Sequence, residues 1–345
     1  MVGLFMGIYS IAAVAGRPIV GWILQKYGVV TALMIGSLAI SLPALGYIGL
    51  IDHGLHPLMW MLRLVQGFGY GAHFSAAFTL AAELAPTTRR NEAIAMYGAS
   101  GLTASMIGPY VGESLMRSTG LSMFFLAMCI VGVIAAIIIA RVRLPNVHSS
   151  LKAKTPPFRD MFESKQLRIL LAISFLLAIC YSSPTSFIAT VAKARSVQHF
   201  SLYFTAWGIT GILTRLIGGT WADRLGARQV LIPGFLFYAS GLLTIHFSDA
   251  LPGFIIAGVL CGCAHGISFP AVTSLAYTLA PQRLAGSTMA YVTGVMDAGS
   301  AITALLIGSL AQSIGFGIVF PFAASAAMIA FLLVLFAIQK KVQPL

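Results

Sequence analysis

Charged residues are scarce in this sequence. Asp, Glu, Lys and Arg together make up 9% of the 345 residues, whereas a soluble globular domain carries about 25%. A surface in contact with water needs charge, and 58% of these residues are hydrophobic. The shortage therefore excludes an ordinary soluble protein and predicts a chain embedded in lipid.

Acidic residues are the scarcer of the two signs. Nine Asp and Glu stand against 21 Lys and Arg, which gives a formal net charge of +12. A basic balance of this size can indicate nucleic-acid binding. Here, however, the basic residues lie at the ends of apolar segments and not on one face, which is typical of charges that set membrane topology. We expect no nucleic-acid partner.

Cysteines and cofactor motifs are also few. The four cysteines all lie inside apolar segments, so neither a disulfide nor a zinc site is predicted. Cys261 and Cys263 would point about 200° apart on a helix and could not hold one ion together. The sequence has no Walker phosphate loop, which would indicate ATP drive, and no soluble nucleophile triad. We therefore predict no enzyme activity, no cofactor and no metal.

Long apolar segments are abundant. A stretch of about 20 apolar residues crosses roughly 30 Å of hydrocarbon, and such stretches form helices because lipid offers the backbone no hydrogen bonds. The sequence predicts eleven of them, which define an all-α membrane protein. They span residues 2–24, 29–51, 57–82, 93–116, 119–140, 169–190, 200–222, 229–247, 251–280, 287–312 and 316–338.

Two of these segments end in copies of one pattern. Residues 21–28 (GWILQKYG) and 219–226 (GTWADRLG) are 198 positions apart, and each copy follows an arginine at the same spacing, Arg17 or Arg215. The chain is thus predicted to consist of two copies of one membrane module. Duplicated helical halves around a central site are typical of secondary transporters.

A linker separates the two copies. Residues 142–168 contain three prolines and no long apolar run. We predict an N-terminal helical bundle over residues 1–141 with five spans and a C-terminal bundle over residues 169–345 with six.

The loop charges predict the orientation. Fifteen Lys and Arg residues lie in one alternating set of loops, which includes the linker and the C-terminus, and only Arg117, Lys193 and Arg195 lie in the other set. The positive-inside rule assigns the richer set to the cytoplasm. We expect a bacterial-type inner-membrane protein whose C-terminus is cytoplasmic and whose first residue lies outside.

One segment, residues 169–190, has no partner in the first copy. The expectation is an initial span missing from the chain, through a misassigned start codon, a truncated gene or a naturally short protein. A second interpretation is a signal peptide that ends at Ala13-Val14-Ala15. That stretch lacks the positive region at the start of signal peptides, and cleavage there would cut the duplicated module.

The second copy of the repeat resembles a known loop motif. The matching residues are Gly219, Asp223, Arg224, Gly226 and Arg228. They are similar to the motif Gly-x-x-x-Asp-Arg-x-Gly-x-Arg between the second and third helices of the major facilitator superfamily, whose members have two six-helix halves. The resemblance implies a two-bundle transporter around a central cavity, with family helices 2–6 in the first half and 7–12 in the second.

In physical terms these loops are a cytoplasmic gate or a topology anchor, because both roles use the same residues. The first copy departs from the motif, since Gln25 and Lys26 after Gly21 replace the aspartate and the arginine. A neutral Gln25 predicts a weaker gate there. Glu83 is expected to form a cytoplasmic ion pair near Arg90 at the inner end of the third segment.

The third segment resembles another family motif. Arg63, Gly67 and Gly69 match the fourth-helix pattern Arg-x-x-x-Gly-x-Gly, which in the family is linked to proton coupling. The resemblance implies that role for Arg63. The alternative is an arginine that simply extends to the lipid headgroups.

The fourth segment is similar to the fifth-helix motif of proton-driven exporters, Gly-x-x-x-Gly-Pro-x-x-Gly-Gly. Gly108, Pro109 and Gly112 match it, while Ala104 and Glu113 depart from it. Pro109 bends the helix because it removes a hydrogen bond. The resemblance implies export, and the alternative is a packing kink that any transporter needs. Glu113 is a candidate for proton coupling or a plain interfacial carboxylate.

Polar residues deep in the apolar segments are candidates for substrate binding. His73 and His265 lie midway along two repeat-related segments, on nearly the same helical face, and could bind substrate or titrate. The alternative is a histidine bonded to a neighbouring helix. Hydroxyls near Pro184 could face the cavity or satisfy the carbonyl that the proline frees. The other predicted cavity residues are Tyr181, Ser182, Thr185 and Tyr291.

Asp297 is the acid predicted near the membrane centre. A carboxylate there is expensive to bury and is functional by default, which makes Asp297 the candidate proton carrier. The alternative is a helix-packing role beside Gly299.

The sequence therefore predicts a secondary active transporter that works by alternating access. Proton-coupled efflux of a small organic molecule, a drug or a metabolite, is the favoured activity. The alternatives are proton-coupled uptake of a sugar or organic acid, and a truncated membrane protein that does not transport. The expected partners are the substrate, protons and the lipid bilayer, and the expected state is a monomer.

Overall fold

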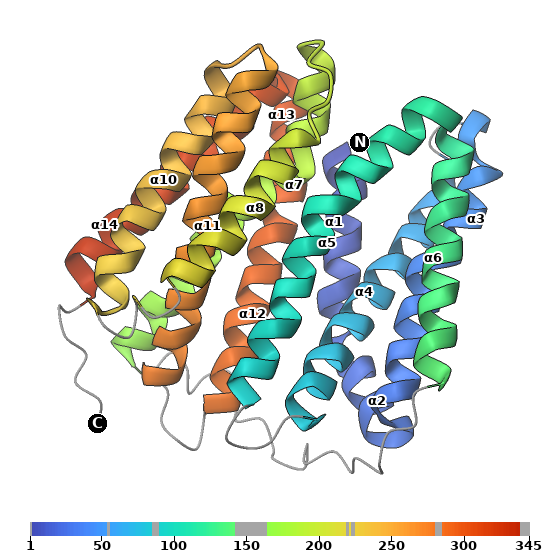
Figure 1. The fold of residues 1–345 in the computed structure, drawn as a ribbon, viewed down its shortest axis with the longest axis horizontal. Helices are drawn as coiled ribbons and strands as arrows, with labels where there is room; N and C mark the ends of the chain where they lie inside the picture. Colours follow the sequence, from blue (N-terminus) through green and yellow to red (C-terminus); the bar gives the residue numbers. More distant parts are fainter. Residues whose placement is uncertain are drawn as a thin grey trace. The chain divides into compact units, whose positions relative to one another are not determined.

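The described part of the chain is helical. The computed structural model describes residues 2–53, 56–84, 90–141, 164–218, 221, 225–279 and 285–338, and its regular elements are α-helices with short 3-10 and π segments (Figure 1). The all-α prediction is confirmed.

The chain forms two compact units. The N-terminal unit comprises Phe5–Gly101 and Val111–Lys154, and the C-terminal unit comprises Met1–Leu4, Leu102–Tyr110 and Thr155–Leu345. Residues 102–110, in the middle of a helix from the first half of the sequence, therefore belong to the C-terminal unit. Leu102 lies in the hydrophobic core of that unit. The bundle boundaries predicted above stay a prediction.

The N-terminal unit is built on its second helix. Helix α2 packs against α4 and α6, and the short α3 packs against the same two helices. The elements are α1 (Val2–Ala15), α2 (Arg17–Ser41), α3 (Pro43–Ile48), η1 (Ile51–His53), α4 (Pro57–Leu84), α5 (Arg90–Thr119) and α6 (Leu121–Arg141) (Figure 1).

The C-terminal unit has a larger buried core. Helix α11 packs against α8 and α10, α10 packs against α14, and α7 packs against α12 and α14. The elements are α7 (Lys165–Ala194), α8 (Leu202–Gly218), α10 (Ala227–Phe247), α11 (Leu251–Leu279), α12 (Ala285–Ile302), η5 (Thr303–Ile307), α13 (Gly308–Ile314), η6 (Phe316–Ile318) and α14 (Val319–Ala337) (Figure 1).

Several helices are long and apolar enough to cross a membrane. Among the described residues there are seven, or eight if a bent pair near the N-terminus counts as one span. Apolar side chains on α6 are widely exposed, for example Val131 at 67%, as expected for a lipid-facing helix. The predicted number of eleven spans stays a prediction.

The first predicted span is broken. Residues 2–24 form α1 and the beginning of α2, and Gly7–Ala15 and Arg17–Leu24 meet at an angle of 43°. Pro18 stands at the start of α2, where its missing N–H removes no hydrogen bond from the new helix. The bend therefore lies directly before Arg17.

The backbone repeats at the turns. In the part of the chain that the structure describes, the glycines with positive φ are Gly28 (83°), Gly120 (87°), Gly226 (90°) and Gly315 (101°), and Gly28 divides α2 into two helical parts at a kink. Gly28 and Gly226 are 198 positions apart, and Gly120 and Gly315 are 195 apart. A side chain at such a φ is strained, so glycine is required in both copies of each turn. The predicted duplication is thus also present in the backbone.

Helix contacts repeat in the same way. Gly67 and Gly71 on α4 pack against the backbone of α1, and Gly262 and Gly266 on α11 pack against that of α8. The two pairs are 195 positions apart. A Cβ atom at any of the four sites would collide with backbone atoms of the neighbouring helix. Each unit therefore holds one helix pair at a distance that only glycine permits.

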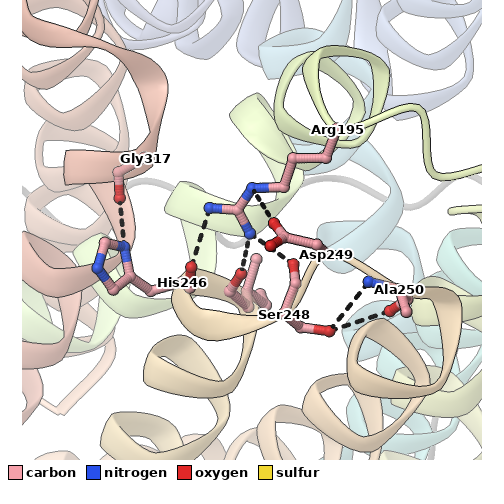
Figure 2. Close-up of polar contacts among 7 residues, drawn as sticks. Arg195, His246, Ser248, Asp249, Ala250 and Gly317 are labelled. Carbon is pink, nitrogen blue, oxygen red and sulfur yellow. Dashed lines mark hydrogen bonds and ion pairs between the residues drawn. The ribbon is translucent and has the colours of Figure 1, made fainter.

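An arginine side chain caps the C-terminal end of α10 in the C-terminal unit (Figure 2). The Arg195 guanidinium donates to the carbonyl oxygens of Ile245 (2.6 Å), His246 (2.9 Å) and Ser248 (2.6 Å). Its Nε lies 3.4 Å from a carboxylate oxygen of Asp249. The last carbonyls of a helix lack helical partners, so Arg195 supplies the donors that α10 needs.

Candidate functional site

One predicted cavity residue of the C-terminal unit, Tyr181, lies against His265 on α11. The Nδ1 of His265 lies 2.9 Å from the hydroxyl of Tyr238 on α10. The imidazole stacks on Tyr181 of α7, with ring centres 5.1 Å apart, and also contacts Trp207 of α8 and Phe269. Only 7% of His265 is exposed. The structure thus brings His265 and Tyr181 together within a cage of aromatic rings.

The two predicted cavity hydroxyls beside Pro184, those of Thr185 and Ser182, differ in their hydrogen bonds. Thr185 is exposed, but its hydroxyl donates to the carbonyls of Tyr181 (3.1 Å) and Ser182 (3.0 Å). Ser182 is 4% exposed, and its hydroxyl has no hydrogen-bond partner among the described residues. Thr185 therefore binds carbonyls of its own helix, but neither is the Cys180 carbonyl, four residues before Pro184, that the proline leaves without its helical N–H. Ser182 keeps a buried hydroxyl without a partner among the described residues.

His73 makes a corresponding contact in the N-terminal unit. Its Nδ1 lies 3.1 Å from the hydroxyl oxygen of Ser37 on α2. Gly36 on the same helix packs directly against the backbone of His73. Each predicted histidine therefore has one ring nitrogen bound to a neighbouring helix of its own unit, and the other cavity candidate, Tyr291, is partly buried on α12.

Arg63 lies between aromatic rings near the start of α4. Its guanidinium carbon is 4.8 Å from the ring centres of both Phe5 and Tyr9 on α1. A cation above a neutral aromatic ring is attracted by the negative electrostatic potential of the ring face. The predicted proton-coupling arginine is therefore held inside its unit by α1, and not extended to the end of α4.

A hydrogen bond to Gln66 holds the Arg63 side chain in place. The side-chain oxygen of Gln66 accepts from Arg63 (3.1 Å) and from the hydroxyl of Tyr47 on α3 (3.0 Å), and its amide donates to the carbonyl of Ile40 on α2 (3.1 Å). Gln66 is 2% exposed. The sequence analysis assigned it no role, although a glutamine inside an apolar segment is itself a sign of a required hydrogen bond.

Glu113 is paired in the structure. One carboxylate oxygen lies 2.9 Å from Nη2 and 3.1 Å from Nε of Arg117, one turn later on α5. Glu113 is 5% exposed. Pro109 lies inside the same helix, and Gly112 faces the ring of Phe124 on α6, whereas a Cβ atom at Gly108 would meet nothing within 4 Å.

Asp297 lies on α12, a helix that packs against α7. Gly299, two residues later, packs against the backbone of Phe175 and the side chain of Ala178. Asp297 is partly buried and interacts with other residues. The helix continues as a π segment, Thr303–Ile307. Such segments are rare and are found mostly at functional sites.

Much of the predicted cytoplasmic gate lies outside the described residues. This applies to Gly219, Asp223 and Arg224, and to the side chains of Gln25, Glu83 and Arg90. Among the described gate residues, Gly226 has the positive φ reported above, and a Cβ atom at Gly21 would meet nothing within 4 Å.

Two basic gate residues have defined contacts. Lys26 lies 4.9 Å from the ring centre of Trp22 and 5.2 Å from that of Tyr27. Arg228 donates to the carbonyl of Leu335 on α14, at 2.7 Å. Both cations therefore bind within their own units, at the ends of helices.

Arg215 on α8 is a polar residue to which the sequence analysis gave no role. Its guanidinium carbon lies 5.4 Å from the ring centre of Phe269 on α11. Arg215 is partly exposed, but its Nε is buried and has no hydrogen-bond partner among the described residues. A charge inside an apolar segment was the signal that could have identified it.

Metal-binding clusters are absent from the described part of the chain, where no three His, Cys, Asp or Glu residues could hold one ion. The cysteines Cys129, Cys180, Cys261 and Cys263 are all free. The polar groups present can form hydrogen bonds, bind a charge or carry a proton.

Comparison with known proteins assigns these features to one family. The family model described as Major Facilitator Superfamily matches residues 1–203 and 192–344. YttB of Bacillus subtilis strain 168, named as an uncharacterized MFS-type transporter, is 27% identical over 328 residues, which cover 91% of this chain and 80% of YttB. Staphylopine export protein of Staphylococcus aureus strain Mu50 is 21% identical, with 92% of this chain and 82% of that protein covered.

Solved structures show the same fold. The nucleoside transporter NupG superposes with a TM-score of 0.79 at 13% identity, covering 98% of this chain and 90% of NupG. The Escherichia coli fucose:proton symporter FucP superposes with a TM-score of 0.64 at 15% identity, covering 97% and 91%.

Proposed function

Because this chain belongs to the Major Facilitator Superfamily, we propose that it exports a small organic molecule in exchange for protons. The observation that carries alternating access is the repeated helix packing. The close contacts of α4 with α1 recur in those of α11 with α8, so each unit has a tightly packed pair of helices. Packed interiors resist deformation, and stiff units that move as rigid bodies are what alternating access requires.

Export is favoured by the middle of α5. Pro109 and its neighbouring glycines resemble the family's exporter motif, and Pro109 stands inside a continuous helix. One relative is named as an export protein for staphylopine. We assign no particular substrate from that name, because the two chains are 21% identical.

We assign the proton to Asp297. It lies on a helix that packs closely against α7 and continues as a π segment, a place where a small rearrangement can change the surroundings of the carboxylate. Glu113 is a weaker candidate because protonation would break its ion pair with Arg117. Arg63 lies among aromatic rings and acts here as a fixed charge.

The remaining assignments follow from the same mechanism. The substrate is bound by the histidines and by the hydroxyl and phenol groups of α7 and α12, that is His73, His265, Tyr181, Ser182, Thr185 and Tyr291. The repeated loops at residues 21–26 and 219–228 close the cytoplasmic side. The protein works as a monomer in a bacterial inner membrane.

Proton flux in inside-out membrane vesicles tests the proposal. Respiration acidifies the lumen, and a substrate of an antiporter added outside enters while protons leave. We expect a panel of small organic anions and cations to contain compounds that raise the lumenal pH of vesicles that hold the unaltered protein. The same compounds should not raise the pH of vesicles that hold the Asp297→Asn variant. No pH change with any compound would contradict proton-driven export.

Uptake is the second candidate. Ala104 and Glu113 depart from the exporter motif, and the fucose:proton symporter shares this fold. A symporter would carry substrate and protons in the same direction. Accumulation of a labelled compound in right-side-out vesicles with an acidic exterior would therefore favour uptake over export.

A further inference from the structure

Arg215 differs from the other arginines described in the membrane-spanning helices. Arg63 is bound by Gln66, and Arg117 is paired with Glu113. At Arg215 no hydrogen bond or ion pair reaches the guanidinium from the described residues, and its contact is the face of Phe269. A cation in a membrane helix without a hydrogen bond or ion pair costs free energy, and charged residues in such positions are usually functional.

Simple extension to the lipid headgroups does not describe this side chain. Arg215 lies one turn before the end of α8 at Gly218, close enough for its head group to reach the membrane surface. Its head group instead lies over a ring of α11, with Nε shielded from solvent. The guanidinium is thus aimed at the neighbouring helix within the unit.

The surroundings of Arg215 are aromatic. Phe269 contacts it on one side and continues, ring against ring, to His265 and Tyr181. Phe269 and Tyr181 are partly exposed, whereas His265 and Trp207 are buried. A molecule that reaches Arg215 would therefore meet its guanidinium beside the partly exposed ring of Phe269.

We propose that Arg215 and Phe269 form a recognition site for an organic anion that carries an aromatic ring. The guanidinium binds the anionic group, for which its planar fork of donors is suited, and the ring of the ligand packs against the exposed part of Phe269. This inference rests on the proposed transport function and names the class of its substrate. A ligand then provides the charge compensation that the described residues do not give Arg215.

Binding to the purified protein in lipid nanodiscs tests the site without transport. The probe is naphthoate, compared with decahydronaphthoate, which keeps the charge but loses the flat ring, and with naphthyl-trimethylammonium, which keeps the ring but reverses the charge. We expect equilibrium dialysis to show saturable binding, with the highest affinity for naphthoate, a lower affinity for decahydronaphthoate and the lowest for the ammonium compound. Preferred binding of the cation, or no saturable binding of naphthoate, would overturn the proposal.

Variants locate the site. Arg215→Met should weaken naphthoate binding about 10- to 100-fold, the range for a lost hydrogen bond to a charged group, and Arg215→Lys should weaken it less. Phe269→Leu should weaken it about 2- to 10-fold. The matched controls are Lys165→Gln, which removes an exposed charge of the same unit, and Phe322→Leu, which removes an exposed ring from α14.

Stability separates recognition from a structural role. Arg215→Met removes a partly exposed charge that no described residue pairs, so it should raise the temperature of thermal unfolding while it weakens binding. If both stability and binding fall, Arg215 is structural and the proposal is wrong. Unchanged binding in Arg215→Met, or competition by anionic lipid alone, would also overturn it.

Transport assays distinguish the two proposals. Naphthoate binding that depends on Arg215, without proton exchange in vesicles, would leave the recognition site standing and contradict the export function. Proton exchange driven by other compounds, without naphthoate binding, would support the export function and contradict the recognition site.

Discussion

Replacement of Arg195 should be among the most destabilising single changes in the C-terminal unit. Its guanidinium donates to three carbonyls at the end of α10, and a hydrogen bond that involves a charged group contributes about 1.5–3 kcal/mol net. Three such bonds set an upper limit of about 5–9 kcal/mol. Water can reach part of a helix end, so we expect Arg195→Gln to lower the free energy of unfolding by about 2–5 kcal/mol.

The ion pair with Asp249 should contribute little. The Asp249 side chain is 85% exposed while that of Arg195 is 18% exposed, and an ion pair with one exposed partner is worth about 0–1 kcal/mol. Asp249→Asn is therefore the matched control, because it removes the ion pair and leaves the three carbonyl contacts. Arg195→Lys should lie between the two variants, since one ammonium group cannot serve three carbonyls in this geometry.

Thermal unfolding in nanodiscs, followed by tryptophan fluorescence, checks this order. The expected loss of stability is largest for Arg195→Gln, smaller for Arg195→Lys and near zero for Asp249→Asn. Equal losses for Arg195→Gln and Asp249→Asn would mean that the ion pair, and not the helix end, makes the main contribution. That result would refute the reasoning.

Three further predictions follow from the proposed mechanism. Asp297→Asn should abolish gradient-driven accumulation but keep part of substrate-for-substrate exchange in loaded vesicles, and full gradient-driven transport would contradict the proton assignment. A reporter fused after Ala192 should be active outside the cytoplasm and one fused after Leu151 inside it, so the reverse result for either fusion would overturn the orientation. Asp223→Asn should slow transport far more than Gln25→Ala in the same assay, because only the aspartate carries charge, and equal rates would indicate a topology anchor.

The fold could be predicted from the sequence because it depends on composition and on the length of apolar segments, which can be read along the chain without knowledge of tertiary contacts. Low charge and apolar segments of spanning length require helices in lipid, and the 198-residue offset between two short patterns indicates the duplication. The structure extends this result, since the glycines at the turns and at the helix contacts repeat at offsets of 198 or 195. Glycine at those sites is a steric requirement, which a sequence repeat records directly.

The candidate site could be predicted only by residue type. Histidine, aspartate and arginine in apolar segments were recognised as unusual, but their partners were not. Ser37 beside His73 and Tyr238 beside His265 are hydroxyl residues from other helices, and no spacing in the sequence connects them. Gln66 and Arg215 were passed over for the same reason, because their importance lies in what surrounds them.

Composition and repetition by themselves determined that this chain is an all-α membrane protein with two related halves. Tertiary structure alone decided that α1 and α2 meet at an angle, that Arg63 lies between two rings of α1 and that Arg215 faces Phe269. The physical reason is that a membrane helix is apolar around most of its circumference. Its hydrophobic pattern therefore does not indicate which side meets a neighbour, and close packing between helices makes that choice.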